Sequence, residues 1–467
     1  MPTSSAVPSL VARARAAQAG FAQAGQAEVD EAVTALAWSI YRPDRARDLA
    51  ERAVAETGLG NVADKIVKKQ RKTFGTLRDL LRARSVGVIE ENPARGIVKI
   101  AKPVGVVAAI TPATNPGATP VNKAMMAIKG RNAIIIAPSP AALETTSHAV
   151  ALMRAELTRI GKPADLVQIL PSPVSRDATA ELMRQVDLVV VTGSQANVRQ
   201  AYSSGTPAIG VGVGNVPVII DETADMEDAA AKIAASKSFD NATSCSSENA
   251  LIILNSVYGR ALEALHRAGA YVVDAQEKKR IGQRLWQDGK LNRSLIARDA
   301  ALLAERFELG ADARNARFFL VPAETIGPGE PFSGEKLSLV LTLYQARDFD
   351  HALDLARRLL NHQGRGHSVG IHTRDTGRAR RLAEQIDAVR VLVNQAHTFG
   401  NGGGFDNGLG FTLSMGCGTW GGNSISENLS WRHFVNITHL VTPIAEDRPG
   451  EGDLFGAYWE RHGHGPS

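Results

Sequence analysis

The alternation of apolar and amphipathic segments after residue 104 constrains the fold of this chain most strongly. Between residues 104 and 191, short apolar runs alternate with segments of helical periodicity, and these runs are VGVVAAI, NAIIIAP, DLVQIL and VDLVVV. Strands that are apolar on both faces and separated by helices are typical of a parallel sheet covered by helices on both sides. The sequence therefore predicts an α/β fold for this region.

A second set of strands and helices follows a helix that we expect at 224–239. It starts with NALIILN at Asn249 and runs to about residue 415, with strands in KLSLVLTLY, RGHSVGIHT and AVRVLVN and helices in FDHALDLARRLL and TGRARRLAEQI. A chain of 467 residues is long enough for more than one domain. We expect two α/β lobes, and a junction between lobes is a common place for an enzyme cleft.

The region before the first sheet is predicted to be helical. Residues 5–82 carry helical periodicity, with a break at GLGN, residues 58–61. Residues 86–102 then read as two short strands joined by a turn that contains Asn-Pro. Asn115 and Pro116 are predicted to open the next helix as a polar cap and a first-turn proline.

The two cysteines of the chain have different surroundings. Cys245 lies in SKSFDNATSCSSEN, a loop of small polar residues whose free backbone N–H groups favour a thiolate. We interpret it as a nucleophile, with a half-buried packing residue as the alternative. Cys417 lies among glycines beside Trp420 and is interpreted as structural. Their separation predicts neither a disulfide framework nor a zinc site, and it suits a reducing cytoplasm.

Charge and hydropathy exclude several classes of function. Lys and Arg number 53 and Asp and Glu 48, a net charge of +5 that suits anionic cofactors but lacks the basic stripes of nucleic-acid binders. Charged helical stretches such as Arg378, Arg380 and Arg381 are interpreted as solvated faces. The N-terminus resembles neither a secretory signal nor an anchor, and no run approaches the roughly 20 apolar residues of a membrane span. His462 and His464 are assigned to a frayed end rather than to a metal site.

Two glycine- or turn-rich segments are candidates for binding an anion. TPATN at 111–115 follows a strand and opens a helix, where free N–H groups and the helix dipole favour phosphate or an oxyanion. GVGVG at 210–214 is not a G-x-G-x-x-G fingerprint, because its third glycine comes one residue early. On its own it is consistent with a flexible strand end.

Seven segments in order resemble the CoA-acylating branch of the aldehyde dehydrogenase superfamily over nearly the whole chain. They are ITPATNP, VTGS, PAIGVGVGNVPVIID, FDNATSCSSE, EKLSLVL, GHSVGIH and GCGTWGGNSISEN. The resemblance implies an aldehyde dehydrogenase-like fold with helices and a dinucleotide-binding domain at 1–237, a catalytic domain at 238–415, and a tail at 416–467 that returns to the cofactor domain. It also implies a homodimer or homotetramer formed through 86–102 and 430–441.

The resemblance assigns chemistry to individual residues. Cys245 would attack the aldehyde, and a hydride would pass to a nicotinamide, leaving a thioester. The side chain of Asn115 and the backbone N–H of Cys245 would stabilise the alkoxide, with a helix cap as the alternative role of Asn115. Hydrolytic relatives carry a glutamate in the segment that corresponds to 209–217, and this chain has none there. A thiol such as that of coenzyme A would then collect the acyl group.

The resemblance also implies a dinucleotide site, NAD or NADP. The residues expected to contact the dinucleotide are Ile110, Thr111, Pro112, Ala113, Thr114, Asn115, Gly193, Ser194 and Gly212. Glu335 would bind the nicotinamide ribose, with an ordinary surface acid as the alternative. Hydrolytic relatives hold the adenine ribose with a lysine after the second strand, where this chain has APSPAA at 137–142. The sequence therefore does not choose between NAD and NADP. His367 would take the proton of the CoA thiol, or serve as a structural histidine.

Three strings resemble the members of this branch that oxidise sulfoacetaldehyde: ENPARGIVKIAKPVGVVAAITPATNP, NQAHTFGNGGGFDNG and FTLSMGCGTWGGNSISENLSWRHF. We expect that aldehyde, with acetaldehyde or propanal as alternatives. A sulfonate favours Arg or Lys donors, but the sequence places none of them. The stretch from Gln395 to Asn407, with His397 and Asn401, is predicted to bind the anionic head. A non-catalytic scaffold and a hydrolytic enzyme are the competing functions, and Cys245 with Asn115 disfavours the scaffold.

Overall fold

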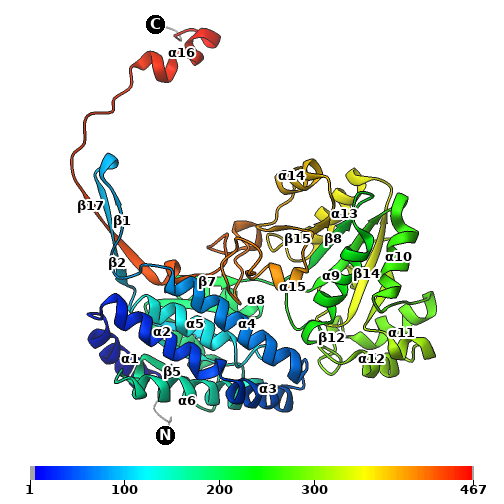
Figure 1. Ribbon diagram of the computed structural model, residues 1–467, viewed down its shortest axis with the longest axis horizontal. Coiled ribbons are helices and arrows are strands. Elements are labelled where there is room, and N and C mark those ends of the chain that lie inside the picture. Colours follow the sequence, from blue (N-terminus) through cyan, green and yellow to red (C-terminus); the bar gives the residue numbers. More distant parts are fainter. Residues whose placement is uncertain (1–5, 465–467) are drawn as a thin grey trace.

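The structure is a computed structural model that describes residues 6–464. Two α/β lobes lie next to each other, and a narrow sheet with a long C-terminal arm projects from the first lobe (Figure 1). This arrangement confirms the predicted fold class. Within residues 6–464, no helix has both the length and the apolar composition needed to cross a membrane.

Four helices open the first lobe, as the periodicity predicts. They are α1 (Val7–Phe21), α2 (Gln26–Tyr41), α3 (Pro43–Thr57) and α4 (Val62–Leu81). The break at 58–61 has a local cause, because Gly58 ends α3 in the left-handed conformation with φ of 65°. Asn61 then caps α4 by accepting a hydrogen bond from the backbone N–H of Asp64.

The first lobe is built on a five-stranded parallel sheet in the order β5-β4-β3-β6-β7. Its strands are β3 (Val106–Ile110), β4 (Ala133–Ala137), β5 (Val167–Ile169), β6 (Leu188–Thr192) and β7 (Ala208–Val211). The helices after the first strand are α5 (Thr119–Lys129), α6 (Leu143–Arg159), α7 (Arg176–Gln185) and α8 (Gln195–Tyr202).

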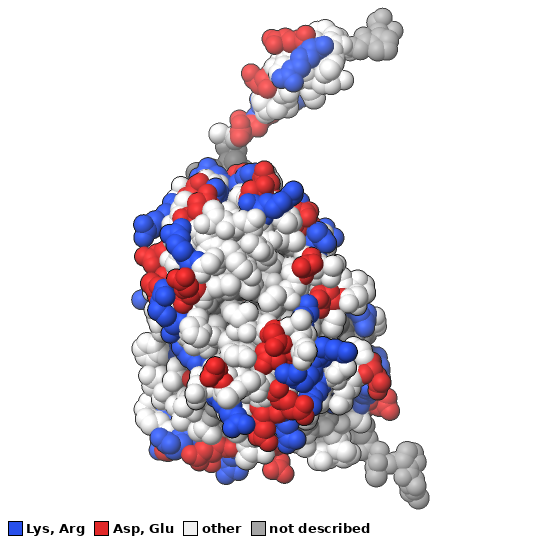
Figure 2. All heavy atoms as spheres, turned by 90° about the vertical axis from the view of Figure 1, so that its right-hand side faces the viewer, with Lys and Arg blue, Asp and Glu red and all other residues white. Residues whose placement is uncertain are grey.

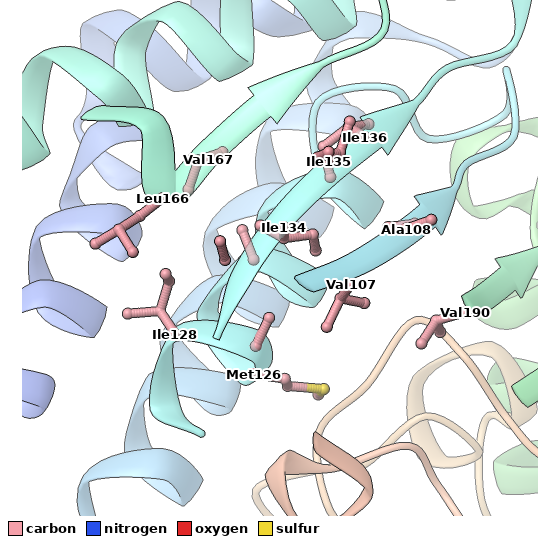
Figure 3. Close-up of a cluster of buried hydrophobic side chains, with 14 of the residues drawn as sticks. Val107, Ala108, Met126, Ile128, Ile134, Ile135, Ile136, Leu166, Val167 and Val190 are labelled. Carbon is pink, nitrogen blue, oxygen red and sulfur yellow. The ribbon is translucent and has the colours of Figure 1, made fainter. Parts of the chain in front are cut away.

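Continuous apolar runs become the central strands because both faces of this sheet are covered. Val107, Ile134 and Val190 come from three neighbouring strands and meet Met126 and Ile128 of α5 (Figure 3). All five are at most 1% exposed. Burying one such side chain contributes about 1.5–3 kcal/mol. The core therefore holds the carboxyl ends of β3, β4 and β6 in fixed positions.

The helix after β3 begins later than predicted. Asn115 and Pro116 lie in a turn, and α5 starts at Thr119 with Pro120 in its first turn. The backbone N–H groups of Ala118 and Thr119 donate to the main-chain carbonyl of Asn115, at 3.3 and 3.1 Å. The side chain of Asn115 is therefore not used as a helix cap.

The second lobe contains a seven-stranded parallel sheet in the order β10-β13-β14-β9-β8-β15-β16. The strands are β8 (Val216–Ile220), β9 (Glu248–Leu254), β10 (Ala270–Val272), β13 (Phe318–Pro322), β14 (Val340–Ala346), β15 (Val369–His372) and β16 (Val391–Val393). Its helices are α9 (Met226–Ser238), α10 (Tyr258–Arg267), α11 (Ala275–Leu285), α12 (Ala300–Phe307), α13 (Phe349–His362), α14 (Thr376–Gln385) and α15 (His397–Gly400), and a small hairpin joins β11 (Trp286–Gln287) to β12 (Lys290–Leu291).

Two boundaries of this lobe differ from the expectation. By strand pairing the chain passes from one sheet to the other between Val211 and Val216, upstream of residue 237, because β8 pairs with β9 and β15. The strand expected from Lys336 begins at Val340, because Leu337 has φ of 43° and interrupts the extended chain.

A three-stranded antiparallel sheet projects from the first lobe. The predicted hairpin is β1 (Gly87–Asn92) and β2 (Ile97–Pro103), and β17 (Val435–Val441) pairs with β2. The chain then extends to α16 (Glu451–His462), which the sequence analysis did not predict and which lies apart from both lobes (Figure 1). On the face shown in Figure 2, positive and negative side chains are mixed around a broad uncharged area, without a continuous basic stripe.

Candidate active site

Most of the predicted site residues border one cavity between the two lobes. This cavity, which we call the chamber, has a volume of about 310 Å³ and is lined by residues of both lobes. The predicted residues that line it are Pro112, Thr114, Asn115, Gly193, Ser194, Gly212, Cys245 and Glu335. Segments that lie more than 200 residues apart, Pro112 and Glu335 among them, are thus brought to one space.

Cys245 lies in the irregular connection between α9 and β9. Asp240, Asn241 and Ala242 have φ of 50°, 52° and 59°, and these left-handed residues turn the chain out of the helix. The thiol is half-buried. A Cβ atom on Gly214 would lie 2.0 Å from the carbonyl oxygen of Cys245. The GVGVG segment is therefore glycine-rich where its backbone packs directly against the loop of Cys245.

Asn115 is oriented by a buried lysine of α4. The ammonium of Lys68 donates to Asn115 Oδ1 at 3.1 Å, to Asp240 Oδ2 at 2.5 Å and to Thr243 Oγ1 at 2.8 Å. Because the amide oxygen accepts from Lys68, the amide nitrogen is the group left to donate. Its protein contact is a long one, 3.4 Å to Thr114 Oγ1. The side chain thus offers an N–H donor to the chamber, as an oxyanion site requires.

The thiol of Cys245 is neutral near pH 7, which differs from the expectation that polar neighbours favour the anion. Burial raises its pKa to about 12, and the negative charges of Glu335 and Cys417 raise it further than Arg390 and Ser246 lower it. The loss of hydration raises the pKa more than the small polar neighbours lower it. A thiolate in a partly buried cavity loses more solvation energy than its contacts supply. The proton must therefore leave as the sulfur attacks.

Glu335 is the one carboxyl group among the residues that line the chamber. Burial raises its pKa to about 8. Its Oε1 atom is buried and has no hydrogen-bond partner among the described residues. The predicted alternative, an ordinary surface acid, does not describe this environment, and an unpartnered carboxyl oxygen suits a ligand hydroxyl.

His367 does not line the chamber. Its imidazole is fully buried, with Nδ1 at 2.8 Å from Ser368 Oγ and with Nε2 unpartnered among the described residues. Burial, aided by Arg390, lowers its pKa to about 3. The main-chain carbonyl of His367 accepts from Arg390. The imidazole is thus a neutral group inside the second lobe.

A larger groove adjoins the chamber in the first lobe. Its volume is about 560 Å³, and it shares Pro112, Thr192, Gly193 and Ser194 with the chamber. Ile110, Thr111 and Ala113 also line it, at the carboxyl end of β3. The strand order reverses between β3 and β6, and such a crevice is where open α/β sheets bind dinucleotides.

The residues of the groove fit a dinucleotide. Arg176 and Arg293 line it and supply positive charge for a diphosphate. Thr111 Oγ1 is buried without a partner among the described residues, so it is free to bind a ligand. Gly193 and Ser194 precede α8, where backbone N–H groups point outward from the helix end.

The sequence analysis missed the buried basic face of α4. Lys65, Lys68, Lys69 and Lys72 are at most 8% exposed, whereas Val67 and Phe74 on the same helix are 48% and 52% exposed. Lysines at spacings of three and four residues beside exposed apolar residues were the available signal. The analysis also missed Arg390, which is 4% exposed. Its guanidinium donates hydrogen bonds to the carbonyl oxygens of His367 and Gly416.

His462 and His464 lie on the projecting arm, away from the chamber. Between residues 6 and 464, no group of three or more His, Cys, Asp or Glu side chains is placed to hold a metal ion.

Comparisons with known proteins agree with this geometry. The model of the aldehyde dehydrogenase family matches residues 2–282. The chain is 55% identical to a sulfoacetaldehyde dehydrogenase (acylating) of Cupriavidus necator over 98% of this chain and 93% of that protein. An acetylating aldehyde dehydrogenase of Geobacillus thermoglucosidasius superposes with a TM-score of 0.91 at 34% identity, covering 95% of this chain and 98% of that one. A propionaldehyde dehydrogenase of Rhodopseudomonas palustris with bound CoA and an acylated cysteine superposes with a TM-score of 0.82 at 26% identity, covering 93% and 97%.

Proposed function

The chain belongs to the aldehyde dehydrogenase family, and on that premise we propose that it oxidises sulfoacetaldehyde with coenzyme A to sulfoacetyl-CoA, or catalyses the reverse. The observation that carries the proposal is the chamber itself. Cys245 and Asn115 face one space, a groove fit for a dinucleotide opens into it, and no carboxylate is present at 209–217. The 55% identity to an acylating sulfoacetaldehyde dehydrogenase supports the choice of substrate.

The first half-reaction forms a bond between Cys245 and the substrate. The thiol gives up its proton to solvent water as the sulfur attacks the carbonyl carbon. The alkoxide is stabilised by the amide of Asn115 and the backbone N–H of Cys245. A nicotinamide dinucleotide, when bound, supplies the acceptor for the hydride. The acyl group then remains on the sulfur as a thioester.

The second half-reaction transfers the acyl group to a thiol. Gly212 and Gly214 have no side chain that could activate water, and Gly214 leaves no space for one. A thiol of pKa about 8.5 ionises far more readily than water and needs less assistance from a base. The thiolate of coenzyme A attacks the thioester carbon, and Cys245 leaves as the thiolate. The product is the acyl-CoA.

The dinucleotide would be held by the residues from Ile110 to Asn115, with Gly193, Ser194 and Gly212 around it and Glu335 at the ribose. The groove and the unpartnered oxygen atoms of Thr111 and Glu335 support this assignment. NAD and NADP are the two candidates. For the assembly we propose a homodimer or homotetramer formed through β1, β2 and β17, because β17 is exposed along most of its length. Two free cysteines suit a reducing cytoplasm.

A single incubation series tests the proposal. The enzyme is given sulfoacetaldehyde, acetaldehyde or propanal with NAD or NADP, with and without coenzyme A. We expect reduction of the dinucleotide only with coenzyme A, fastest with sulfoacetaldehyde. Equal rates without coenzyme A, with free acid as the product, would instead identify a hydrolytic enzyme, and no turnover of any aldehyde would identify a scaffold.

A further inference from the structure

A small basic cavity opens from the chamber beyond Asn115. Its volume is about 30 Å³, and it shares no lining residue with the dinucleotide groove. It adjoins the chamber, because five residues border both spaces: Lys72, Asn115, Ser244, Thr398 and Leu413. Lys68 and Arg71 of α4 complete its basic wall. A substrate whose carbonyl lies at Asn115 therefore has this cavity beside it.

Two of the cations in this wall lack a carboxylate partner. Lys65 and Lys68 form ion pairs with Asp240, at 3.2 and 2.5 Å. Neither Arg71 nor Lys72 forms an ion pair within residues 6–464, and Asp406 influences Arg71 only through space. Lys72 is 8% exposed, and its ammonium donates to the carbonyl oxygen of Gly402 at 2.6 Å. Lys72 is buried and Arg71 is half-buried, and a charge that has lost hydration is costly unless it is paired, so these two cations favour an anion as a ligand.

Arg71 is held in place by aromatic rings. Its guanidinium carbon lies 5.3 Å from the ring centre of Phe399, 5.6 Å from that of Phe405 and 5.9 Å from that of Phe411. Its Nε atom is buried and has no hydrogen-bond partner among the described residues. Its one hydrogen bond to a described residue is long, 3.4 Å from Nη2 to the carbonyl oxygen of Phe399, so ring stacking positions the guanidinium while most of its donors stay available.

Thr398 adds an uncharged donor. It is 7% exposed and borders both the chamber and the basic cavity. Its hydroxyl has no hydrogen-bond partner among the described residues. A buried hydroxyl without a partner is costly, which indicates that a ligand oxygen satisfies it.

We propose that Arg71, Lys72 and Thr398 form an anion subsite that holds the sulfonate of the aldehyde and selects it over uncharged aldehydes. This inference rests on the proposed function. A sulfonate is permanently charged and has three acceptor oxygens, which suits a guanidinium, an ammonium and a hydroxyl arranged around it. Only one methylene separates the sulfur from the carbonyl carbon in sulfoacetaldehyde. The anionic head must therefore lie next to Asn115, where the basic cavity opens.

The subsite differs from the one expected at residues 395–407. That stretch contributes Thr398, Phe399 and Gly402, but its two polar candidates line neither space. His397 Nε2 lies 2.9 Å from Ser368 Oγ, and Asn401 donates to Ser246 Oγ at 2.9 Å. The charge comes instead from α4, more than 300 residues earlier in the chain.

The main test is the ratio of kcat/KM for sulfoacetaldehyde to kcat/KM for propanal. Arg71→Met and Lys72→Met are each expected to lower this ratio about 10- to 100-fold, because each removes one charge-assisted contact. Arg71→Lys keeps the positive charge but removes the planar guanidinium with its paired N–H donors, so the ratio should be intermediate. Arg78→Met is the matched control. Arg78 also stacks on Phe405 and Phe411, at 5.2 and 5.0 Å, but lines neither space, so the ratio should not change.

Ethanesulfonate, an unreactive analogue, tests the subsite without relying on turnover of sulfoacetaldehyde. It should inhibit propanal oxidation by competing with propanal, and Arg71→Met and Lys72→Met should raise its inhibition constant at least about 10-fold. Competition in a wild-type enzyme that does not oxidise sulfoacetaldehyde would overturn the proposed substrate and support the subsite. If the wild type oxidises sulfoacetaldehyde and the folded variants keep both the ratio and the inhibition constant, the subsite is overturned. A rise in KM for coenzyme A with an unchanged ratio would overturn it as well.

Discussion

The two ends of the chamber recognise their ligands by different means. The end next to the dinucleotide groove is built from backbone and small residues at the carboxyl ends of strands, such as Pro112, Gly193 and Ser194. The opposite end is built from the long side chains of one helix, among them Lys68, Arg71 and Lys72. A site made of backbone changes only when the fold changes, whereas a site made of side chains changes with single substitutions. Substrate preference is therefore expected to vary at α4 while the dinucleotide site stays the same.

The largest effect is expected at Cys245, which serves both ends. Cys245→Ala should lower turnover of every aldehyde by about 10⁴-fold or more, because no acyl intermediate can form. CoA-dependent reduction of the dinucleotide measures it. Cys417→Ala is the control, since Cys417 is 1% exposed and does not line the chamber, and it should retain activity. Substantial activity in Cys245→Ala would remove the basis of the proposed chemistry.

Asn115 should affect every aldehyde alike. Asn115→Ala is expected to lower kcat about 10²- to 10³-fold through loss of one oxyanion donor. The ratio of sulfoacetaldehyde to propanal should remain that of the wild type. Lys68 keeps its contacts with Asp240 and Thr243, so the basic wall remains in place. An effect confined to sulfoacetaldehyde would reassign Asn115 to the anion subsite.

KM for sulfoacetaldehyde should depend on pH above about 7 more strongly than KM for propanal does. Burial lowers the pKa of Lys72 to about 7, and the charges of Arg71 and Lys68 lower it as well. Only the protonated ammonium attracts a sulfonate, so KM for sulfoacetaldehyde should rise above pH 7, by up to about tenfold per pH unit. KM for propanal measured over the same range is the internal control. Lys72→Met should abolish the difference between the two profiles, and identical profiles in the wild type would argue against a role for this charge.

The smallest effect is expected at the dinucleotide end. Glu335→Gln should raise KM for the dinucleotide about 3- to 10-fold, because an amide replaces one carboxyl contact, and should leave the ratio of aldehydes unchanged. The same variant should make Cys245 react faster with iodoacetamide above pH 8. Glu335 has a pKa of about 8, so above that pH its charge opposes the thiolate, whereas Gln does not. Equal alkylation rates at pH 9 would show that Glu335 does not influence the sulfur.

Much of the fold could be predicted because each strand and helix is a local pattern. The runs at Val106–Ile110 and Ala133–Ala137 are apolar throughout, and both become fully buried strands. The cavity that joins Asn115 to Cys245 agrees with motifs assigned by resemblance. Helix α16 was missed because its sequence carries no clear apolar face, and nothing in either lobe indicates where such an arm would lie.

The sequence by itself determined the strands and helices, because neighbouring residues and local spacing define them, and its resemblance to a family named Cys245 and Asn115 as candidates for acyl transfer. Only the tertiary structure decided which groups are buried together. Lys65 and Lys68 of α4 are buried against Asp240, which lies 172 residues after Lys68 in the chain. The pKa of the Cys245 thiol is raised chiefly because burial in the assembled chamber removes the hydration that a thiolate needs. Burial and charge depend on partners that are distant in the chain, so spacing along the sequence records them only in part.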